Sequence, residues 1–409
     1  MISSKPTNYF CTRAIKSQTG ISLIFFALIL VIVSTASFFT YMDSSALKYA
    51  REQTTTDVLA EAKAAVIGDT ISKQNVVEAG YLRLPDIGQN ASSSPTEGNF
   101  GANFTGNSAN FNVLGKLPWK GYKIRPLKDG YSECLWYVVS GRFKITPAST
   151  QPINWDTLGQ IDVIDESGNF MASNLVALII SPGASMPNQD RQLSDEVYSE
   201  CGGNYDARNY LDPFNAEDTI FGNFNYFSGT NKRVAPNSSN TTFVSAKNDF
   251  YNDRLIFITT DEIMSPIVRR ADFSNAISLL MNDSVFDNPL TPITGNKGTS
   301  SVNCSSSTNS TFCNNWKEML FLTMLPSPSS IEIDGSPTPN ECVKVLIFSG
   351  NKTSTQSRAT DSDKLIPANY LENENLASFA VPIAIDTNFK GTSVFDPMNP
   401  TADVIRCIN

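Results

Sequence analysis

The stretch "TGISLIFFALILVIVSTASFFTYM", residues 19–42, decides which fold the sequence predicts. Its apolar run from Ile21 to Met42 is long enough to cross about 30 Å of hydrocarbon as a helix. Lysine and arginine are the only charged residues before the run, and Asp43 follows it. This asymmetry predicts a single-pass membrane protein with a cytoplasmic N-terminus and the rest of the chain on the outer side.

Two simpler roles for this apolar run compete with a specialised helix. A secretory signal peptide has a shorter apolar core followed by small residues at a cleavage site, and "FFTYMD" (38–43) does not fit that pattern. An ordinary single-pass anchor needs the apolar run and nothing beyond it. The residues after Met42 therefore help to distinguish an ordinary anchor from a longer, specialised helix.

The sequence continues in a helical pattern after the apolar run. No proline occurs from Asp43 to Lys73, and Gly68 is the single glycine there. One helix over residues 21–73 would be about 80 Å long, apolar all round in its first half and amphipathic in its second. The apolar residues of the second half recur at helical spacing along one face: Val58, Leu59, Ala62, Ala65 and Val66.

This N-terminus resembles that of type IV pilins and of the pseudopilins of type II secretion. Gly20 corresponds to the last residue of their short basic leader, residues 1–20 here, and "ISLIFFALILVIV" (21–33) to the start of the mature chain. The resemblance implies that a prepilin peptidase cuts between Gly20 and Ile21. The helix then packs with other pilin or pseudopilin subunits in a filament core. The implied location is the bacterial inner membrane with a periplasmic ectodomain, which becomes extracellular if the chain is assembled into a pilus.

Phe25 departs from the family pattern. It occupies the fifth mature position, where most pilins carry a glutamate that offsets the N-terminal amine of the neighbouring subunit. An unpaired charge in hydrocarbon is costly, so the loss of this glutamate weakens a repeated filament contact. The resemblance therefore implies a minor or tip subunit. The alternative is a membrane-anchored periplasmic or surface binding protein that does not polymerise.

The composition argues against an enzyme. The chain of 409 residues has no histidine, which excludes Ser–His and Cys–His nucleophiles, histidine zinc sites and the ordinary proton shuttle at neutral pH. Candidate acid pairs such as Asp261 with Glu262 have a structural explanation at a helix N-terminus, and no glycine-rich phosphate loop is present. We expect no catalytic residue, no cofactor and no metal site. A formal net charge of −9 argues against a nucleic-acid partner.

The seven cysteines divide around the apolar run. Cys11 precedes the run, and no CxxC pair occurs, which argues against a zinc ribbon or a thioredoxin-like site. The six that follow lie on the side predicted to face an oxidising compartment, so we expect disulfides, with fifteen possible connectivities. The closely spaced Cys304 and Cys313 are the easiest pair to close. The candidates are Cys134, Cys201, Cys304, Cys313, Cys342 and Cys407.

Beyond Lys73 the sequence predicts a large β-rich globular ectodomain. Residues 74–113 are rich in Gly, Ser and Asn and are predicted to be a loop or linker. Residues 114–296 are predicted to form a first β-rich unit, and residues 297–409 a second, shorter related unit. The second unit begins with a long loop over 297–342 around one apolar segment, Trp316 to Leu325.

Two local elements stand out within the first unit. A hairpin is predicted from strand 161–164 to a strand starting at Phe170. Its acidic turn "DESGN" (165–169) is interpreted as a plain turn rather than a calcium loop. A strand-to-helix element is predicted over 251–282, with Thr259 and Glu262 forming a capping box.

Two segments of the ectodomain echo one another. "NLVALIISPGASMPNQDR" (174–191) is followed by "NYLD" (209–212), and "CVKVLIFSGNKTSTQSR" (342–358) is followed by "NYLE" (369–372). In each, a buried strand ends in Ser and Gly, and a polar stretch with Gln and Arg follows. The echo predicts an internal duplication in which Tyr210 and Tyr370 pack under equivalent loops. Chance similarity of short strands is the alternative.

With "LPW" (117–119), "LWYVVSG" (135–141) and "NDRL" (252–255), these motifs make the chain similar to a group of large prepilin-like proteins of Gram-negative bacteria. The predicted fold class is α+β: a long N-terminal hydrophobic helix that spans the membrane and enters the filament core, then a β-rich ectodomain for which the echoed segments indicate two related units. The predicted function is non-enzymatic, that of a minor or tip subunit of a type IV pilus or a type II secretion pseudopilus with a disulfide-stabilised head.

Overall fold

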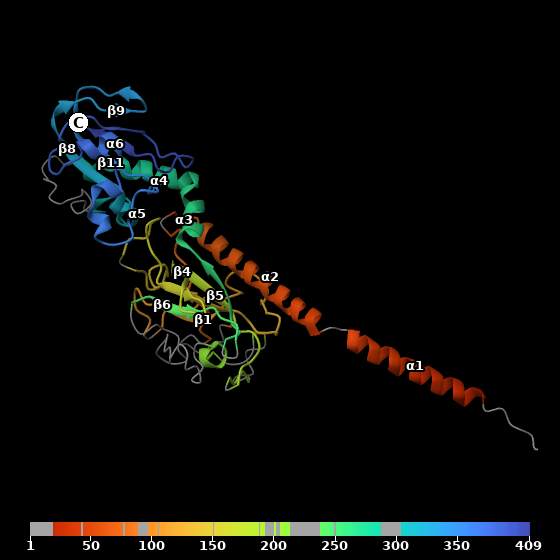
Figure 1. Cartoon of the computed structure of the whole chain (residues 1–409). Coiled ribbons are helices and arrows are strands. Elements are labelled where there is room, and N and C mark those ends of the chain that lie inside the picture. Colours follow the sequence, from red (N-terminus) through yellow and green to blue (C-terminus); the bar gives the residue numbers. More distant parts are fainter. Residues whose placement is uncertain are drawn as a thin grey trace, which may run out of the picture. The chain divides into compact units, whose positions relative to one another are not determined.

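A computed structural model of the chain describes residues 19–409 except 42–43, 77, 89–96, 105, 150, 188, 193–199, 202–204, 213–237, 249–250 and 288–303 (Figure 1). The chain divides into two compact units, Met1–Gln53 and Thr54–Asn409. Most of the predicted leader, residues 1–18, lies outside the described residues. The predicted boundary between 296 and 297 lies outside them as well and stays a prediction.

Helix α1 spans Thr19–Tyr41 and helix α2 spans Ser44–Ile71. The junction between them, residues 42–43, lies outside the described residues, so the expectation of one continuous helix over residues 21–73 stays a prediction. Helix α1 is apolar, while α2 carries charged residues along its length.

The membrane-spanning prediction is wrong. Within the described part of the chain, no helix combines the length and the apolarity that a bilayer crossing requires. This finding overturns the predicted transmembrane segment, the single-pass topology and the location in the inner membrane.

The later part of α2 packs into the core of the second unit. Val58, Ala62 and Val66, spaced four residues apart on one helix face, are at most 3% exposed. Arg270 closes the C-terminal end of the helix: its guanidinium donates to the carbonyl oxygens of Ile71 (2.7 Å) and Lys73 (2.8 Å). These carbonyls have no partner within the helix itself, so the arginine satisfies acceptors that would otherwise be orphaned.

Among the described residues, the largest sheet is antiparallel, with strand order β1-β2-β5-β7. Every residue of β1, β2 and β5 is buried, as expected for strands covered on both faces. The apolar run that begins at Leu135 forms strand β2. The four strands span Val113–Lys116 (β1), Trp136–Val139 (β2), Ala177–Ser181 (β5) and Arg254–Ile258 (β7).

A second sheet has the order β4-β3-β6. Strands β3 (Ile161–Ile164) and β4 (Phe170–Leu175) pair antiparallel, which confirms the predicted hairpin. In its turn, the Asp165 carboxylate accepts hydrogen bonds from the backbone N–H groups of Ser167 (2.8 Å) and Asn169 (2.9 Å). Strand β6 (Thr241–Val244) pairs parallel with β3.

The predicted strand-to-helix element is confirmed. Strand β7 leads into α3 (Thr260–Val268), and Thr259 and Glu262 form the expected capping box. Pro266 lies inside α3, and a second helix, α4 (Ala271–Met281), follows after Arg269 and Arg270. The Arg270 side chain binds the end of α2 and is partly buried.

A third sheet, β13-β11-β8, is antiparallel, and a fourth, β10-β9-β12, is small. Helices α5 (Ser310–Trp316) and α6 (Asn373–Ser378) accompany them.

The predicted long loop over 297–342 is wrong in its later part, which contains α5 and the ten-residue strand β8. The strands span Leu320–Ser329 (β8), Glu332–Ile333 (β9), Ser336–Pro337 (β10), Cys342–Phe348 (β11), Lys390–Gly391 (β12) and Val404–Ile408 (β13).

The observed fold class differs from the prediction. Among the described residues the chain is a mixed α/β fold with four sheets, and it includes two parallel strand pairs, β3 with β6 and β9 with β12. Parallel pairs require long connections that strand periodicity does not reveal. The predicted linker 74–113 also contributes to the core, since Leu82, Leu84 and Ile87 are at most 2% exposed. A hydrophobic helix that spans a membrane before a β-rich ectodomain is therefore not the architecture observed.

Candidate functional site

The residues predicted to mark leader processing lie at the start of α1. Gly20 and Ile21 belong to its first turn. Phe25, which replaces the glutamate of most pilins, lies about one turn further on and is 62% exposed. The apolar residues around it are exposed as well: Leu23, Ile24, Phe26, Leu28, Ile29, Leu30, Val31, Ile32 and Val33.

In the second unit, Arg191 and Tyr210 form a cluster beside β5. The guanidinium carbon of Arg191 lies 5.3 Å from the centre of the Tyr210 ring, within the range of a cation–π interaction. The same guanidinium donates to the carbonyl oxygens of Gly183 (2.8 Å) and Asn209 (3.1 Å). On its other side, the buried Tyr210 ring lies 5.3 Å from the ring of Trp136 in β2.

Arg358 and Tyr370 form a matching cluster beside β11. The guanidinium carbon lies 4.2 Å from the centre of the Tyr370 ring. The guanidinium donates to the carbonyl oxygens of Gly350 (3.1 Å) and Asn369 (2.5 Å). The fully buried Tyr370 ring lies 5.3 Å from the ring of Phe321 in β8. Each tyrosine therefore packs between an arginine and an aromatic residue of a neighbouring strand.

The two clusters occupy equivalent positions on their sheets. Ile180 of β5 pairs with Trp136, and Ile347 of β11 pairs with Phe321. On the opposite edge, β7 and β13 each pair antiparallel with the central strand. Strands β2-β5-β7 thus correspond in order and direction to β8-β11-β13, and the echoed sequence segments provide the central strand and the arginine of each set.

The acidic partners of the two arginines differ. Arg358 forms an ion pair with Asp156 (3.2 Å) in which neither side chain is exposed, whereas Arg191 approaches the partly exposed Glu133 at 3.4 Å. Burial raises the pKa of Asp156, and the nearby Arg358 guanidinium opposes that rise. The Arg358 site therefore holds a charge pair removed from water, which is stable only while both partners are present.

Two buried carboxyl groups adjoin the Arg191 cluster. The backbone N–H of Asp212 donates to the Asp253 carboxylate (3.0 Å), and the N–H of Asp253 donates to the Asp212 carboxylate (2.9 Å). Burial raises the pKa of Asp212 to about 6. Burial and the neighbouring Asp212 charge raise the pKa of Asp253 well above its ordinary value. Two carboxylates this close and this buried resist joint ionisation.

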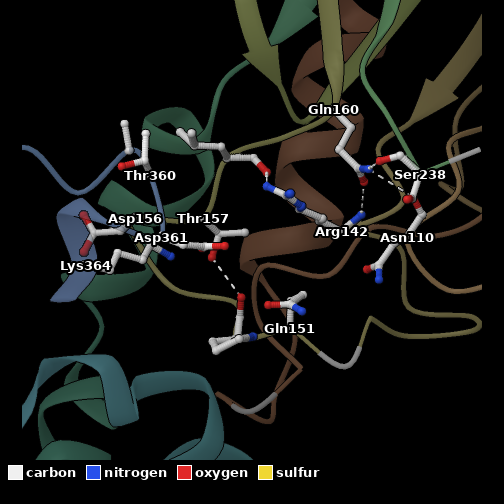
Figure 2. Close-up of a pocket in the computed structure, with 13 residues that line it drawn as sticks. Asn110, Arg142, Gln151, Asp156, Thr157, Gln160, Ser238, Thr360, Asp361 and Lys364 are labelled. Atoms are coloured by element: carbon white, nitrogen blue, oxygen red, sulfur yellow. Dashed lines mark hydrogen bonds between the residues drawn. The ribbon is translucent and has the colours of Figure 1, made fainter. Parts of the chain in front are cut away.

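Next to the Arg358–Asp156 ion pair is a pocket with a volume of about 450 Å³ (Figure 2). One wall is fixed by Gln160, whose amide group donates to the carbonyl oxygens of Asn110 and Ser238 and accepts from the backbone N–H of Arg142. The opposite wall includes Lys364, in the segment that follows Arg358. The lining is predominantly polar: Asn110, Arg142, Gln151, Pro152, Asp156, Thr157, Leu158, Gln160, Ser238, Ala359, Thr360, Asp361 and Lys364.

The charges in this pocket are balanced. Lys364 is paired with Glu318 at 3.2 Å, and Asp156 is paired with Arg358. Arg142 donates to the Leu158 carbonyl oxygen (3.3 Å) and contacts no carboxylate among the residues that the structure describes. Within the same part of the chain, no three acidic or cysteine side chains converge as a metal site would require. The pocket is therefore suited to a polar ligand that both donates and accepts hydrogen bonds.

All six predicted disulfide candidates are paired, which confirms that part of the sequence prediction. The pairs are Cys134–Cys201, Cys304–Cys313 and Cys342–Cys407, with Cα atoms 5.3 to 5.5 Å apart. Cys304–Cys313 is the pair that its short spacing favoured. The bond between Cys342 and Cys407 joins neighbouring strands β11 and β13.

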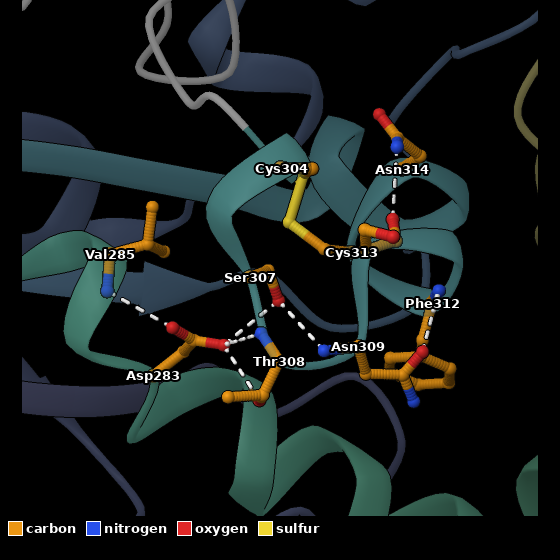
Figure 3. Close-up of a disulfide and its surroundings, with 10 residues drawn as sticks. Asp283, Val285, Cys304, Ser307, Thr308, Asn309, Phe312, Cys313 and Asn314 are labelled. Carbon is orange, nitrogen blue, oxygen red and sulfur yellow. Dashed lines mark hydrogen bonds between the residues drawn. A yellow bond between two sulfur atoms is a disulfide. The ribbon is translucent and has the colours of Figure 1, made fainter.

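The short disulfide loop is attached to the helix before it through Asp283 (Figure 3). The Asp283 carboxylate accepts hydrogen bonds from the Ser307 hydroxyl (2.8 Å), the Thr308 hydroxyl (3.0 Å) and the Thr308 backbone N–H (3.0 Å). Its other oxygen accepts from the N–H of Val285 (3.0 Å). The Ser/Thr-rich sequence around Cys304 thus contains a defined hydrogen-bonded structure as well as a disulfide.

Comparison with known proteins finds no family model that matches the chain, and no curated protein or solved structure that is significantly similar to it.

Sequence reasoning missed the Asp156–Arg358 ion pair and the pocket beside it. The two partners are 202 positions apart, and the pocket combines segments around residues 110, 142, 156 and 361 that share no motif. One signal was available: the echoed segments each contain an arginine after the strand. A buried arginine needs a partner for its charge, but the sequence does not say which acid provides it.

Proposed function

We propose that this chain is a non-enzymatic, pilin-like structural subunit, a minor or tip component of a type IV pilus or of a type II secretion pseudopilus. In this role α1 packs with helices of other subunits, and the disulfide-stabilised second unit is displayed as a head. The chain catalyses no reaction itself. It joins a filament through α1 and displays the second unit. The prepilin peptidase and other pilin or pseudopilin subunits are its proposed partners.

The observation that carries this proposal is the exposure of α1. Leu23 through Val33 includes ten large apolar side chains that are each between 53% and 74% exposed. A helix that is apolar all round is stable in a water-soluble assembly only when other protein surrounds it. Packing among helices of neighbouring subunits provides that cover.

The position of Phe25 supports a minor role. An apolar side chain at this position packs in a helical filament core, but it offers no carboxylate to a neighbouring N-terminal amine. A subunit of this kind is better suited to an end or a single position of a filament than to a repeated one, because the end of the filament has fewer such contacts to satisfy.

The first test is the mass of the mature N-terminus. The chain isolated from cells that contain a prepilin peptidase should begin at Ile21 with an N-methylated amine, and from cells without the peptidase it should begin at Met1. Gly20→Asp should block cleavage. Gly68→Ala is the matched control, since a Cβ at Gly68 meets no atom within 4 Å, and it should be cleaved normally. A chain that keeps Met1 in the presence of the peptidase contradicts the proposal.

The second test measures assembly. Leu28→Asp puts a charge on α1 and should remove the chain from the sheared filament fraction, as detected by immunoblot. Leu279→Asp is the control, because Leu279 lies on α4 and is 67% exposed, so it should leave incorporation unchanged. Equal recovery of both variants in that fraction would show that α1 does not mediate assembly.

A further inference from the structure

We propose that each of the two equivalent strand sets contains a pH-sensitive latch, a pair of acid side chains that stays closed while it holds a proton and opens when both acids ionise. The first repeat is β2-β5-β7 with its loops, and its pair is Asp212 and Asp253. The second repeat is β8-β11-β13 with its loops, and its pair is Glu372 and Asp403. The latches belong to the second unit of the chain and do not depend on filament assembly.

The first acid of each pair is bound by a glutamine at the same position in both repeats. The side-chain amide of Gln189 donates to the Asp212 carboxylate (3.2 Å). In the second repeat, the amide of Gln356 donates to the Glu372 carboxylate (2.6 Å). Each glutamine belongs to the loop after the central strand and lies two residues before the arginine of its cluster. The first acid is therefore tied to that loop in the same way in both repeats.

The second acid of each pair lies directly before the third strand, Asp253 before β7 and Asp403 before β13. The Asp253 carboxylate accepts from the backbone N–H of Asp212 (3.0 Å). The Asp403 carboxylate accepts from the backbone N–H of Gly350 in the loop after β11 (3.3 Å) and from the Asn375 amide (2.8 Å). Each of these carboxylates thus joins the start of the third strand to a segment that is distant in the sequence.

In the first repeat the connection is reciprocal. The Asp212 carboxylate accepts from the backbone N–H groups of Asn252 (2.5 Å) and Asp253 (2.9 Å). The Asn252 side chain donates to the Ala184 carbonyl oxygen (2.9 Å), which extends the connection to the loop after β5. Oδ1 of Asp253 receives no hydrogen bond from the residues that the structure describes. A proton on this oxygen therefore displaces no donor, and the closed arrangement can hold it.

The groups that face the first pair favour a retained proton. Burial raises the pKa of Asp212 to about 6. The pKa of Asp253 is raised well above its ordinary value by burial, by the charge of Asp212 and by a side-chain hydrogen bond between the two acids. The Arg191 guanidinium, which is paired with Glu133, opposes both rises without reversing them. The pair therefore keeps a proton at a pH at which an exposed aspartate has lost its own.

The groups that face the second pair act in the same direction. Burial raises the pKa of Asp403 to about 7, and the charge of Glu372 adds to this rise. Burial also raises the pKa of Glu372, although the hydrogen bond from Gln356 opposes the change. The Arg358 guanidinium opposes both rises but is itself paired with Asp156. The two repeats thus share the response to pH as well as the hydrogen bonds.

The direction of the response follows from these pKa values. In an open latch water reaches both acids, and their pKa values return to the ordinary range near 4. The closed latch therefore binds more protons than the open one between about pH 4 and the raised pKa values, so opening becomes more favourable as pH rises through this range. Opening separates the loop after the central strand from the start of the third strand.

The test is amide hydrogen exchange of the full chain at about pH 4.5 and about pH 8, with rates expressed as protection factors to remove the pH dependence of the exchange chemistry. The reporters are the amides of Asp212 and Gly350, which each donate to a latch carboxylate. Between the two pH values, the protection of each reporter should decrease by about a hundredfold or more. An unchanged protection factor at either reporter overturns the proposal.

Urea shows whether the opening is local. A local opening exposes little surface, so at pH 8 the protection of Asp212 and Gly350 should change by less than about twofold when urea is raised to about 1 M. The amides of β2 (Trp136–Val139) are buried inside their sheet and should lose protection by about tenfold or more, because they exchange when the whole unit unfolds. Equal urea dependence at the reporters and at β2 overturns the proposal.

The variants Asp253→Asn and Asp403→Asn each remove the charge of one pair, and each is the matched control for the other. In Asp253→Asn, the decrease in protection at Asp212 between the two pH values should be at least about tenfold smaller than in the parent, while Gly350 keeps its full decrease. Asp403→Asn should give the reverse. An unchanged decrease in the substituted repeat, or a reduced decrease in both repeats, overturns the proposal.

Circular dichroism establishes whether each variant is folded. If one variant does not fold, the other still compares the two repeats within one chain. The pH and urea comparisons in the parent chain need no variant and decide the question if neither variant folds.

Discussion

Arg358 and Asp156 form an ion pair with 3.2 Å between Nη1 and Oδ2, and neither side chain is exposed to solvent. The pair joins the segment after β11 to the segment before β3, so it connects two parts of the second unit that are distant in sequence. Burial raises the pKa of Asp156 although Arg358 opposes the rise, which shows how strongly the site disfavours an isolated charge. The stability of this region therefore depends on both partners.

Removing Arg358 should destabilise the second unit severely. Arg358→Met leaves the Asp156 carboxylate buried without its cation, and the loss of one partner of a buried pair costs about 3–5 kcal/mol. Urea unfolding followed by tryptophan fluorescence measures the change. Arg191→Met is the control, because its acid Glu133 is 28% exposed and can be hydrated after the arginine is lost. If the free energy of unfolding decreases no more in Arg358→Met than in Arg191→Met, the explanation by a buried unpaired charge is wrong.

The buried pair of Asp212 and Asp253 should make stability depend on pH. The pKa of Asp212 is raised by burial from 3.8 to about 6 in the folded chain. Between these values the folded chain binds more protons than the unfolded chain, so the free energy of unfolding falls as pH rises from about 4 to 6. The pKa of Asp253 is raised in the same direction, first by burial and then by Asp212, and it extends the fall to higher pH.

Asp253→Asn should reduce this fall. The amide removes the like charge beside Asp212. At pH 8 the free energy of unfolding of the variant should therefore equal that of the parent or exceed it by up to about 1–3 kcal/mol. Urea unfolding at several pH values measures it. Asp165→Asn is the control. The pKa of Asp165 is lowered by its hydrogen bonds with Asn169 and by others in the turn, so the titration of Asp165 affects the free energy of unfolding only below about pH 4. An Asp253→Asn curve parallel to that of the parent contradicts the shared-site explanation.

Local patterns in the sequence predicted the local structure well. The turn residues 165–169 between two strand segments predicted the β3–β4 hairpin, and the spacing of Thr259 and Glu262 predicted the capping box. Both depend on hydrogen bonds between near neighbours. The apolar face of α2 was likewise visible from Val58 and Ala62. Such features need no knowledge of distant segments.

Features that depend on distant contacts were not predictable. The bond from Arg270 to the end of α2 joins residues 199 positions apart, and nothing local to Arg270 distinguishes it from an exposed arginine. The parallel pairing of β3 with β6 and the pocket beside Asp156 have the same origin. The membrane prediction was wrong because it rested on the hydropathy of one segment alone, and no helix in the described part of the chain has the length and apolarity that a crossing requires.

The disulfides should differ in what they contribute to stability. In the chain-entropy account, closing the nine-residue spacing of Cys304–Cys313 contributes about 2.5 kcal/mol, and closing the 65-residue spacing of Cys342–Cys407 about 4 kcal/mol. Replacing both cysteines of a pair with serine should therefore lower the free energy of unfolding less for Cys304–Cys313 than for Cys342–Cys407. Urea unfolding without reductant measures it, after peptide mapping has established the three pairs in the parent. A larger loss for the short loop would show that the hydrogen bonds of Asp283 depend on the disulfide.

Tyr210 and Tyr370 should be equally important, because each ring packs between an arginine and an aromatic residue at equivalent strand positions. Tyr210→Ala and Tyr370→Ala each remove a fully packed ring, and each should cost about 3–5 kcal/mol, measured by urea unfolding. Tyr49→Ala, at a position 72% exposed, should change stability by less than about 0.5 kcal/mol. A large loss at Tyr370 with a negligible loss at Tyr210 would show that the two clusters share a geometry without sharing a structural role.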